Sequence, residues 1–211
     1  MQQHKQVLTN LIGNGVYDNV TPLPKDIQGW ASQSEVFEAV IREWKPKLII
    51  EVGTWKGASA IHMATLCKQN NLDTLILCID TFLGSVEHWV NTPDGAPALN
   101  LKNGRPTIYE QFLSNVIHEQ LTDVILPFTI DSINGGLALH QLGIKADVIY
   151  IDAGHEYESV KADLKTYKEV VRPGGCIVGD DWFHGPIRQA VAEVLGDVIT
   201  LSNDKFLWIN K

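Results

Sequence analysis

Five short apolar runs, separated by segments with helical periodicity, constrain the fold of this chain of 211 residues more than any other feature. The runs cover residues 47–52, 74–80, 124–130, 147–152 and 175–180. Consecutive apolar positions are typical of strands that are covered on both faces, as in a parallel sheet. Because strand, helix and strand alternate, we expect right-handed crossovers with helices on both faces. The pattern therefore predicts a doubly wound α/β domain.

Two of the intervening segments carry clear helix signals. Segment 32–44 opens with Ser32-Gln33-Ser34-Glu35, which has the form of a capping box, and then places its apolar residues on one face. Segment 156–171 repeats apolar residues at steps of three and four. The sequence Arg172-Pro173-Gly174-Gly175 is expected to end that helix and turn the chain.

The tail departs from the alternation of strands and helices. A helix is expected over 187–195, followed by strands over 198–201 and 206–209. The link between these strands, residues 202–205, is too short to hold a crossover helix. The sequence therefore predicts a mostly parallel, Rossmann-like sheet that ends in an antiparallel hairpin at one edge.

Two segments fit no element of the predicted core. Residues 1–31 mix polar residues with glycine and proline, and we expect them to form an N-terminal arm or lid on a domain that covers 32–211. A long insertion at about 84–105 contains Pro93-Asp94-Gly95-Ala96-Pro97. Long insertions above strand ends are often lids or substrate walls, so we expect the insertion to border a site.

The charge balance and composition exclude several classes of protein. With 17 Lys and Arg against 25 Asp and Glu, the net charge of −8 would be repelled by a nucleic-acid backbone or an anionic membrane surface. A content of 45% hydrophobic and 20% charged residues is typical of a globular protein. No apolar run approaches the roughly 18 residues of a membrane span, and the first residues lack the apolar core of a signal peptide. We therefore expect a cytoplasmic protein with neither nucleic acid nor membrane as a partner.

The three cysteines give no sign of a disulfide or a metal site. Cys67, Cys78 and Cys176 are far apart, lie inside apolar stretches and form no Cys-x-x-Cys pair. We expect buried free thiols.

The carboxyl end of each predicted strand carries an acidic residue. These residues are Glu51, Asp80, Asp131, Asp152 and the pair Asp180-Asp181. In an open α/β sheet such ends meet at the crevice where ligands bind. A single Asp at such a place is often only the N-cap of the next helix, but capping is a poor explanation for the whole set. The set therefore indicates a ligand site at this edge of the sheet.

The loop after the first strand, Glu51-Val52-Gly53-Thr54-Trp55-Lys56-Gly57-Ala58-Ser59, narrows the choice of ligand. Gly53 and Gly57 allow a tight turn and a close approach of backbone to ligand. A dinucleotide site needs glycine at the position of Trp55, so NAD, FAD and a nicotinamide oxidoreductase are disfavoured. No Gly-Lys-Ser/Thr follows, so a P-loop is missing too. A ligand with ribose but no pyrophosphate fits better, with Asp80 accepting hydrogen bonds from the ribose hydroxyls.

The segments EVGTWKGASA and CID, followed by IDAGHEYESVKADL and RPGGCIVGDDW, resemble the S-adenosylmethionine-dependent class I methyltransferases over about residues 32–211. The closing antiparallel hairpin is also similar to that family. The resemblance implies that the first loop lies beside the methionine half of S-adenosylmethionine, that Asp80 holds the ribose, and that Asp131 and Ser132 border the adenine. The cofactor-binding residues that it implies are Glu51, Gly53, Thr54, Gly57, Ser59, Asp80, Asp131, Ser132 and Asp152.

Three of the aspartates also indicate a metal ion. Asp152, Asp180 and Asp181 would meet at one rim, where like charges repel and raise one another's pKa. A divalent cation relieves the repulsion, and Mg²⁺ suits carboxylate oxygens, whereas zinc lacks its usual Cys/His cluster. The same positions resemble the metal-dependent O-methyltransferases that act on sugar hydroxyls of macrolide and aminocoumarin compounds. The alternative is that Asp180 and Asp181 only cap a loop and Asp152 contacts only the cofactor.

Methyl transfer to a hydroxyl also needs a base. The acceptor oxygen must lie about 3 Å from the methyl group, in line with the bond to sulfur, and carry oxyanion character. His155 and Asp152 are the candidate catalytic residues, because each could take the hydroxyl proton beside the metal. A histidine before a helix is as often a surface residue, and His184 is a further candidate.

Several aromatic residues could form a wall for the acceptor. Trp89 in the insertion and Trp182-Phe183 after the last aspartates are candidates, since rings stack on sugars and phenols. Trp44, Trp208, Tyr109 and Phe112 are expected to belong to the core.

The sequence thus predicts an S-adenosylmethionine-dependent methyltransferase, with Mg²⁺ or another divalent cation, that methylates a hydroxyl of a small, sugar-like molecule. Alternatives on the same fold are an N-methyltransferase, a catechol-type methyltransferase, or a module that binds S-adenosylmethionine or a sugar without catalysis. Homo-oligomers, with the arm crossing to a neighbour, are also left open by the residues.

Overall fold

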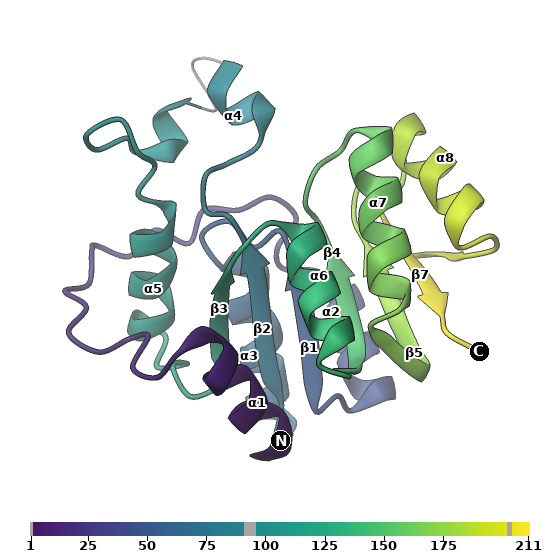
Figure 1. Cartoon of the computed structure of the whole chain (residues 1–211), viewed down its shortest axis with the longest axis horizontal. Coiled ribbons are helices and arrows are strands. Elements are labelled where there is room, and N and C mark those ends of the chain that lie inside the picture. The colour runs from purple at the N-terminus through teal and green to yellow at the C-terminus, as the bar shows by residue number, and fades with distance from the viewer. Residues whose placement is uncertain (1, 91–95, 202–203) are drawn as a thin grey trace.

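The computed structural model describes residues 2–90, 96–201 and 204–211, and within them seven strands form one sheet (Figure 1). The strands are β1 (Leu48–Val52), β2 (Leu75–Asp80), β3 (Ile125–Thr129), β4 (Ala146–Ile151), β5 (Val171–Gly179), β6 (Ile199–Leu201) and β7 (Lys205–Ile209). Their order is β3-β2-β1-β4-β5-β7-β6. The first five strands are parallel, whereas β7 is antiparallel to β5 and to β6. The predicted α/β fold, with its closing antiparallel hairpin, is confirmed.

Helices cover both faces of this sheet (Figure 1). They are α1 (Gln2–Ile12), α2 (Glu35–Trp44), α3 (Ala58–Gln69), α4 (Val86–Val90), α5 (Ile108–His118), α6 (Ser132–Gln141), α7 (Tyr157–Lys168), α8 (Gly185–Val194) and the 3-10 helix η1 (Ala96–Leu99). Apolar residues of α2, α3 and α5 pack on one face, and those of α1, α6, α7 and α8 pack on the other. All five residues of β1 are buried, as expected for a strand between two helical layers. The three cysteines are free and buried, as predicted.

The helix predicted over 32–44 begins later than the capping box indicates. Ser34, not Ser32, is the N-cap of α2, and its hydroxyl accepts a hydrogen bond from the N–H of Val36. The hydroxyl of Ser32 donates instead to the carbonyl of Trp30. The capping-box interpretation was wrong because the Ser32 hydroxyl bonds to Trp30, and residues 29–32 line a cavity before the helix starts.

The helix predicted over 156–171 ends at Lys168, and β5 starts at Val171 rather than at Gly175. Val171 pairs with Ala146, but the next pair is Cys176 with Val148, so β5 carries extra residues in a bulge. The bulge accommodates Pro173, which has no N–H to donate, and Gly174, whose φ is +72°. A sequence typical of a turn therefore lies within a strand.

The N-terminal segment crosses from one helical layer to the other around the edge strand β3. Leu8 of α1 is buried in the layer that contains α6 and α7. The phenol of Tyr17 then donates to the carbonyl of Ile125 in β3 at 2.8 Å. Further on, Asn115 of α5 binds the backbone of Asp26, and the chain passes α5 toward α2 (Figure 1).

The insertion after β2 forms a raised part of the molecule above α5 (Figure 1). It contains α4 and η1, and Lys102 and Arg105 pair through their backbones. Residues Pro93, Asp94 and Gly95 of its proline-glycine motif lie outside the described residues.

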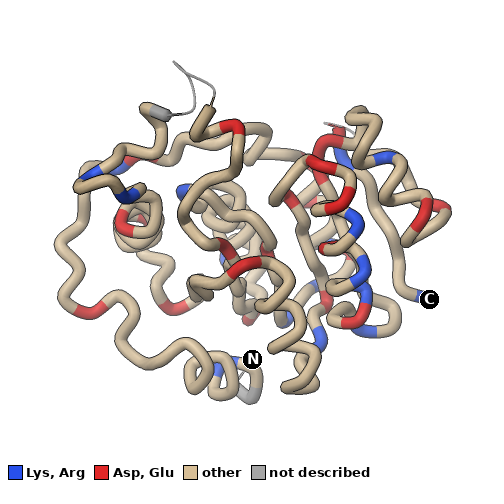
Figure 2. Tube along the Cα trace, turned by 45° about the horizontal axis from the view of Figure 1, so that its top comes forward, with Lys and Arg blue, Asp and Glu red and all other residues tan. Residues whose placement is uncertain are grey.

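Charged residues of both signs are interspersed along the trace (Figure 2). Among the residues that the structure describes, no helix is both long enough and apolar enough to cross a membrane.

Candidate active site

A cavity of about 610 Å³ opens at the carboxyl ends of the parallel strands, where ligands bind in open α/β sheets. The predicted site residues that line it are Gly53, Thr54, Ser59, Asp80, Asp131, Ser132, Asp152, His155, Asp180 and Asp181. Residues 29–31 of the arm, the adjoining Ser32 and the start of the insertion, including His88, form its outer wall. Two predicted residues, Glu51 and Gly57, do not line this cavity.

Glu51 is fully buried beneath the loop between β1 and α3. Its carboxylate accepts hydrogen bonds from the hydroxyls of Thr54, at 2.6 Å, and Ser59. Burial raises the pKa of Glu51 to about 7, although these hydroxyls oppose the shift. Glu51 therefore fixes the loop from below and is not exposed to a ligand.

The two glycines of this loop serve chain packing. Gly53 has a φ of +81°, and a Cβ there would lie 2.1 Å from the carbonyl oxygen of Asp152. Gly57 has a φ of +87°, and a Cβ there would meet Phe112 at 2.9 Å. Protein atoms therefore exclude a side chain at both positions, and the close approach of a ligand to Gly53, which also lines the cavity, stays a prediction. Trp55, at the position where dinucleotide sites have glycine, also has a positive φ, of 52°.

Asp80 faces the cavity but also organises the same loop. Its Oδ2 accepts from the N–H groups of Thr54 and Trp55, both at 2.9 Å, and its Oδ1 accepts from Phe82 at 2.7 Å. A carboxylate offers about four lone-pair positions, so three are in use. One position is left for a ligand hydroxyl.

Asp131 is the N-cap of α6, and it lines the cavity at the same time. Its Oδ1 accepts from the N–H of Asn134 at 2.9 Å, and hydrogen bonds from Asn134 lower the pKa of Asp131. The carbonyl of the neighbouring Ser132 is held by the phenol of Tyr167 at 2.7 Å. Asp131 therefore caps α6, and its place in the cavity also agrees with the prediction that it borders the adenine.

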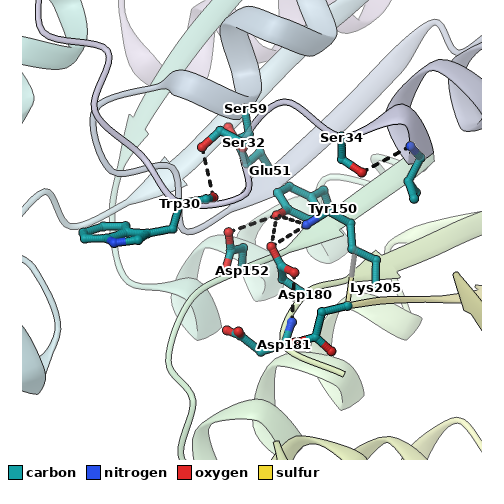
Figure 3. Close-up of polar contacts among 12 residues, drawn as sticks. Trp30, Ser32, Ser34, Glu51, Ser59, Tyr150, Asp152, Asp180, Asp181 and Lys205 are labelled. Carbon is teal, nitrogen blue, oxygen red and sulfur yellow. Dashed lines mark hydrogen bonds and ion pairs between the residues drawn. The ribbon is translucent and has the colours of Figure 1, made fainter. Parts of the chain in front are cut away.

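Tyr150 links the aspartates that follow β4 and β5 (Figure 3). Its phenol lies 2.9 Å from Oδ2 of Asp152 and 2.8 Å from Oδ2 of Asp180. The ammonium group of Lys205 lies 2.5 Å from the same oxygen of Asp180. Burial, and then the charge of Asp180, raises the pKa of Asp152 above its usual range.

His155 forms an ion pair with the third aspartate. Its Nε2 lies 2.9 Å from Oδ2 of Asp181, and its Nδ1 lies 3.6 Å from Oε1 of Glu87 in the insertion. The hydrogen bond with Asp181 raises the pKa of His155 to about 9 and lowers the pKa of Asp181. Two of the three predicted metal ligands are therefore already paired with cations of the chain.

A different set of three residues offers ligand atoms to one metal ion. One atom each of Asp152, His155 and Asp181 lie within 4.8 Å of one another. The predicted set had Asp180 in place of His155, and the carboxylate of Asp180 is bound by Lys205 and Tyr150 instead. Lys205 and His155 neutralise part of the charge of the crowded aspartates, so charge repulsion alone does not require an ion there.

The aromatic wall of the cavity comes from residues that the sequence did not indicate. Trp30 and Trp55 line it, and the Trp55 ring stacks on His88 of α4 with centroids 4.3 Å apart. Trp30 lies against both, at 5.8 Å. The expected residues Trp89, Trp182 and Phe183 do not line this cavity.

Sequence reasoning also missed Tyr150, Lys205 and Glu87. Tyr150 had a signal, because a residue two positions before Asp152 on a strand points to the same face. Lys205 and Glu87 had no such signal. The antiparallel pairing of β7 positions Lys205 and the insertion positions Glu87, and neither follows a local sequence pattern.

A family model described as a methyltransferase domain matches residues 50–182 of the chain. No curated protein matches it. Among solved structures, the O-methyltransferase NovP is 21% identical, with a TM-score of 0.63 over 84% of this chain and 78% of NovP. CalS11, a TDP-rhamnose 3'-O-methyltransferase of calicheamicin biosynthesis, is 18% identical, with a TM-score of 0.56 over 83% of this chain and 77% of CalS11. TomG from Streptomyces achromogenes, an O-methyltransferase in complex with SAM, is 15% identical, with a TM-score of 0.61 over 99% of this chain and 96% of TomG. These similarities establish a common fold.

Proposed function

This chain belongs to the methyltransferase family, and on that premise we propose that it transfers a methyl group from S-adenosylmethionine to a hydroxyl of a small, sugar-like molecule, assisted by a divalent cation. The names of the proteins that share its fold support this direction. Two are O-methyltransferases with SAM or a sugar nucleotide in their descriptions, TomG and CalS11.

One observation carries the proposal. A single cavity contains the loop after β1, the acid at the end of β2, and the donor atoms of Asp152, His155 and Asp181. A methyl donor along the loop and an acceptor at these donor atoms would share that cavity, which has the volume of a typical small-molecule site. Reaction in line with the sulfur–methyl bond needs such a shared cavity.

For the methyl donor, the proposal assigns direct and indirect roles. Gly53 and Thr54 lie where the methionine half would bind, and the free acceptor position of Asp80 suits a ribose hydroxyl. Asp131 and Ser132 would border the adenine. Glu51, Ser59 and Gly57 would act through the loop that they hold.

For the cation, the donor atoms of Asp152, His155 and Asp181 are close enough to bind one ion. Carboxylate oxygens and an imidazole nitrogen suit a divalent ion that keeps positions for water and substrate. When bound, such an ion lowers the pKa of an acceptor hydroxyl and so favours its attack on the methyl group.

Asp152 and His155 differ as proton acceptors. Asp152 has a raised pKa, which suits a carboxylate that must take a proton near neutral pH. His155 is held protonated by Asp181, so it can accept a proton only after it has lost one. Asp152 is therefore the better candidate base, with His155 as a charged partner or a metal ligand.

The arm and the insertion would enclose the acceptor. Trp30 of the arm, Trp55 of the loop and His88 of the insertion contact one another across the outer wall. Flat rings of this kind bind the faces of sugars and phenols.

The test measures methyl transfer from S-adenosylmethionine to a panel of sugar, phenol and amine acceptors, with and without a chelator. Transfer to a hydroxyl that the chelator abolishes supports the proposal. Chelator-resistant transfer to an amine would indicate an N-methyltransferase, and transfer to catechols would indicate the catechol type. Binding of S-adenosylmethionine without transfer to any acceptor would indicate a binding module.

The donor assignment has its own variant. Asp80→Ala should abolish binding of S-adenosylmethionine, because Asp80 faces the cavity and holds the loop after β1. The variant chain should stay folded. Asp73→Ala is the matched control, since Asp73 is exposed just before β2. Unchanged affinity in Asp80→Ala would contradict the donor assignment.

A further inference from the structure

The side chain of Lys205 is fully buried beside the acidic part of the cavity. Its Nζ lies 2.5 Å from Oδ2 of Asp180 and 3.3 Å from the phenol oxygen of Tyr150. The rings of Phe37 and Tyr150 lie 5.5 and 5.2 Å from it (Figure 3 shows Tyr150 and Lys205). Burying an unpaired ammonium group costs folding free energy, so Lys205 can be buried here only because it is paired with Asp180.

The sheet itself places Lys205 opposite Asp180. In the antiparallel pairing of β5 with β7, Gly179 lies opposite Phe206, so the next positions along the two chains are Asp180 and Lys205. The backbone of Asp204 reinforces the register, because its carbonyl accepts from the N–H of Trp182 at 2.9 Å. The ion pair is therefore fixed by main-chain hydrogen bonds on both sides.

This pairing uses both carboxylate oxygens of Asp180. Oδ2 accepts from Lys205 and Tyr150, and Oδ1 accepts from the N–H of Asp181 at 2.9 Å. A metal ligand must offer a lone pair toward the ion. Three of the roughly four lone-pair positions of Asp180 are therefore in use, and Asp180 is not among the three residues, Asp152, His155 and Asp181, whose donor atoms lie within 4.8 Å of one another.

We propose that Lys205 is a resident cation that keeps Asp180 out of the divalent-cation site, so that the ion is held by Asp152, His155 and Asp181. The inference rests on the cation-assisted function proposed above. Imidazole nitrogen suits first-row transition ions, whereas Mg²⁺ prefers oxygen ligands alone. A site with one nitrogen and only two carboxylates therefore selects an ion such as Co²⁺ over Mg²⁺, and Lys205 is the residue that sets this selectivity.

The test titrates the metal-free full chain with Co²⁺, followed by its visible absorption, and then displaces Co²⁺ with Mg²⁺. The decisive variant is Lys205→Met with Asp180→Asn, which removes both charges together and leaves the net charge unchanged. Its dissociation constant for Co²⁺ should stay within about threefold of that of the unaltered chain, whereas Asp181→Asn should weaken binding by about 10- to 100-fold. A loss of about tenfold or more in the paired variant would make Asp180 a ligand and overturn the proposal.

Lys205→Met alone gives a readout that a merely structural role would not produce. It frees Asp180 as a third carboxylate, so Mg²⁺ should bind about tenfold more tightly and the preference for Co²⁺ should narrow. Lys47→Met is the matched control, because Lys47 is exposed before β1 at the opposite end of the sheet. Weaker binding of both ions in Lys205→Met would overturn the proposal, and if this variant does not fold, the paired variant decides.

The same titration separates this inference from the proposed function. If the unaltered chain binds neither Co²⁺ nor Mg²⁺, the inference and the cation-assisted step both fail, while binding of S-adenosylmethionine is measured independently. If the unaltered chain binds Co²⁺ but the paired variant does not, only the assignment of Lys205 and Asp180 fails.

Discussion

The Nε2 atom of His155 lies 2.9 Å from Oδ2 of Asp181, whose backbone has a positive φ of 53°. Aspartate is one of the few residues other than glycine that tolerate this conformation. The bend turns the carboxylate back toward the loop after β4, so the two loops are joined by a charged contact. In the metal-free chain this contact keeps the imidazole protonated at neutral pH.

Asp181→Asn should lower the pKa of His155 from about 9 toward its ordinary value of 6.5, because the hydrogen bond with Asp181 is the largest cause of the shift. NMR titration of the imidazole protons in the metal-free chain measures this change. Glu87→Gln is the control and should have a smaller effect, since Glu87 lies 3.6 Å from the ring. An unchanged pKa in Asp181→Asn would refute the assigned cause.

The raised pKa of His155 also determines how the stability of Asp181→Asn should depend on pH. A histidine whose pKa is raised in the folded state stabilises the fold fully below its unfolded pKa of 6.5, and this stabilisation is lost as the pH rises through about 9. Asp181→Asn should therefore be destabilised at pH near 6, and the difference should disappear near pH 10.

Glu51→Gln should remove a pH dependence of stability. Burial raises the pKa of Glu51 to about 7 from 4.5, so the folded state binds more protons than the unfolded state between these values, and stability falls as the pH rises. The shift corresponds to roughly 3 kcal/mol at pH 8. Urea unfolding at pH 5 and pH 8 should show a smaller loss in Glu51→Gln than in the unaltered chain, with the exposed Glu43→Gln as control. A variant less stable than the unaltered chain at pH 8 would contradict the prediction.

Trp30→Ala should weaken acceptor binding more than donor binding. The Trp30 ring lines the cavity and is 59% exposed, so its removal costs little stability. Loss of one stacking contact should raise KM for the acceptor about three- to tenfold and leave KM for S-adenosylmethionine unchanged. Trp89→Ala is the matched control, because Trp89 is also exposed but does not line this cavity. Equal effects of the two variants would remove Trp30 from the acceptor wall.

Asp152→Asn should reduce kcat by about 100- to 10,000-fold, because the variant loses the carboxylate that we propose as the proton acceptor. Asp131→Asn, at another aspartate of the same cavity, should instead raise KM for S-adenosylmethionine with little change in kcat. Steady-state kinetics separates the two. A kcat for Asp152→Asn near that of the unaltered chain would transfer the role of base to another residue.

The fold could be predicted because its elements carry local patterns. The apolar runs match β1 to β4 within one residue at every end, since a strand that is buried on both faces is apolar at nearly every position. The start of β5 could not be predicted in this way. Pro173 and Gly174 are typical of a turn, and only the pairing of β5 with β4 explains why they lie in a bulge.

The sequence predicted where the site lies on the sheet, but not which side chains contact one another there. Apart from Glu51, the strand-end acids line one cavity, because parallel strands end at the same edge. The partner of Asp180 could not be found from the sequence. A buried lysine is rare, and Lys205 reaches Asp180 only through the antiparallel register of β7. Trp30 and His88 meet through an arm and an insertion that follow no periodic pattern.

Gly53→Ala should be among the most harmful single-methyl changes in the chain. The φ of +81° disfavours any side chain, and the added Cβ would lie 2.1 Å from the carbonyl oxygen of Asp152, so β1 and β4 would have to separate at the cavity. Gly13→Ala is the matched control, because Gly13 has a φ of +89° but nothing within 4 Å of its Cβ position. Backbone strain alone should cost Gly13→Ala about 1 kcal/mol of unfolding free energy, whereas Gly53→Ala should lose at least about 3 kcal/mol. Urea unfolding of both variants measures the difference. Equal losses would mean that strain, and not the contact with Asp152, requires glycine at position 53.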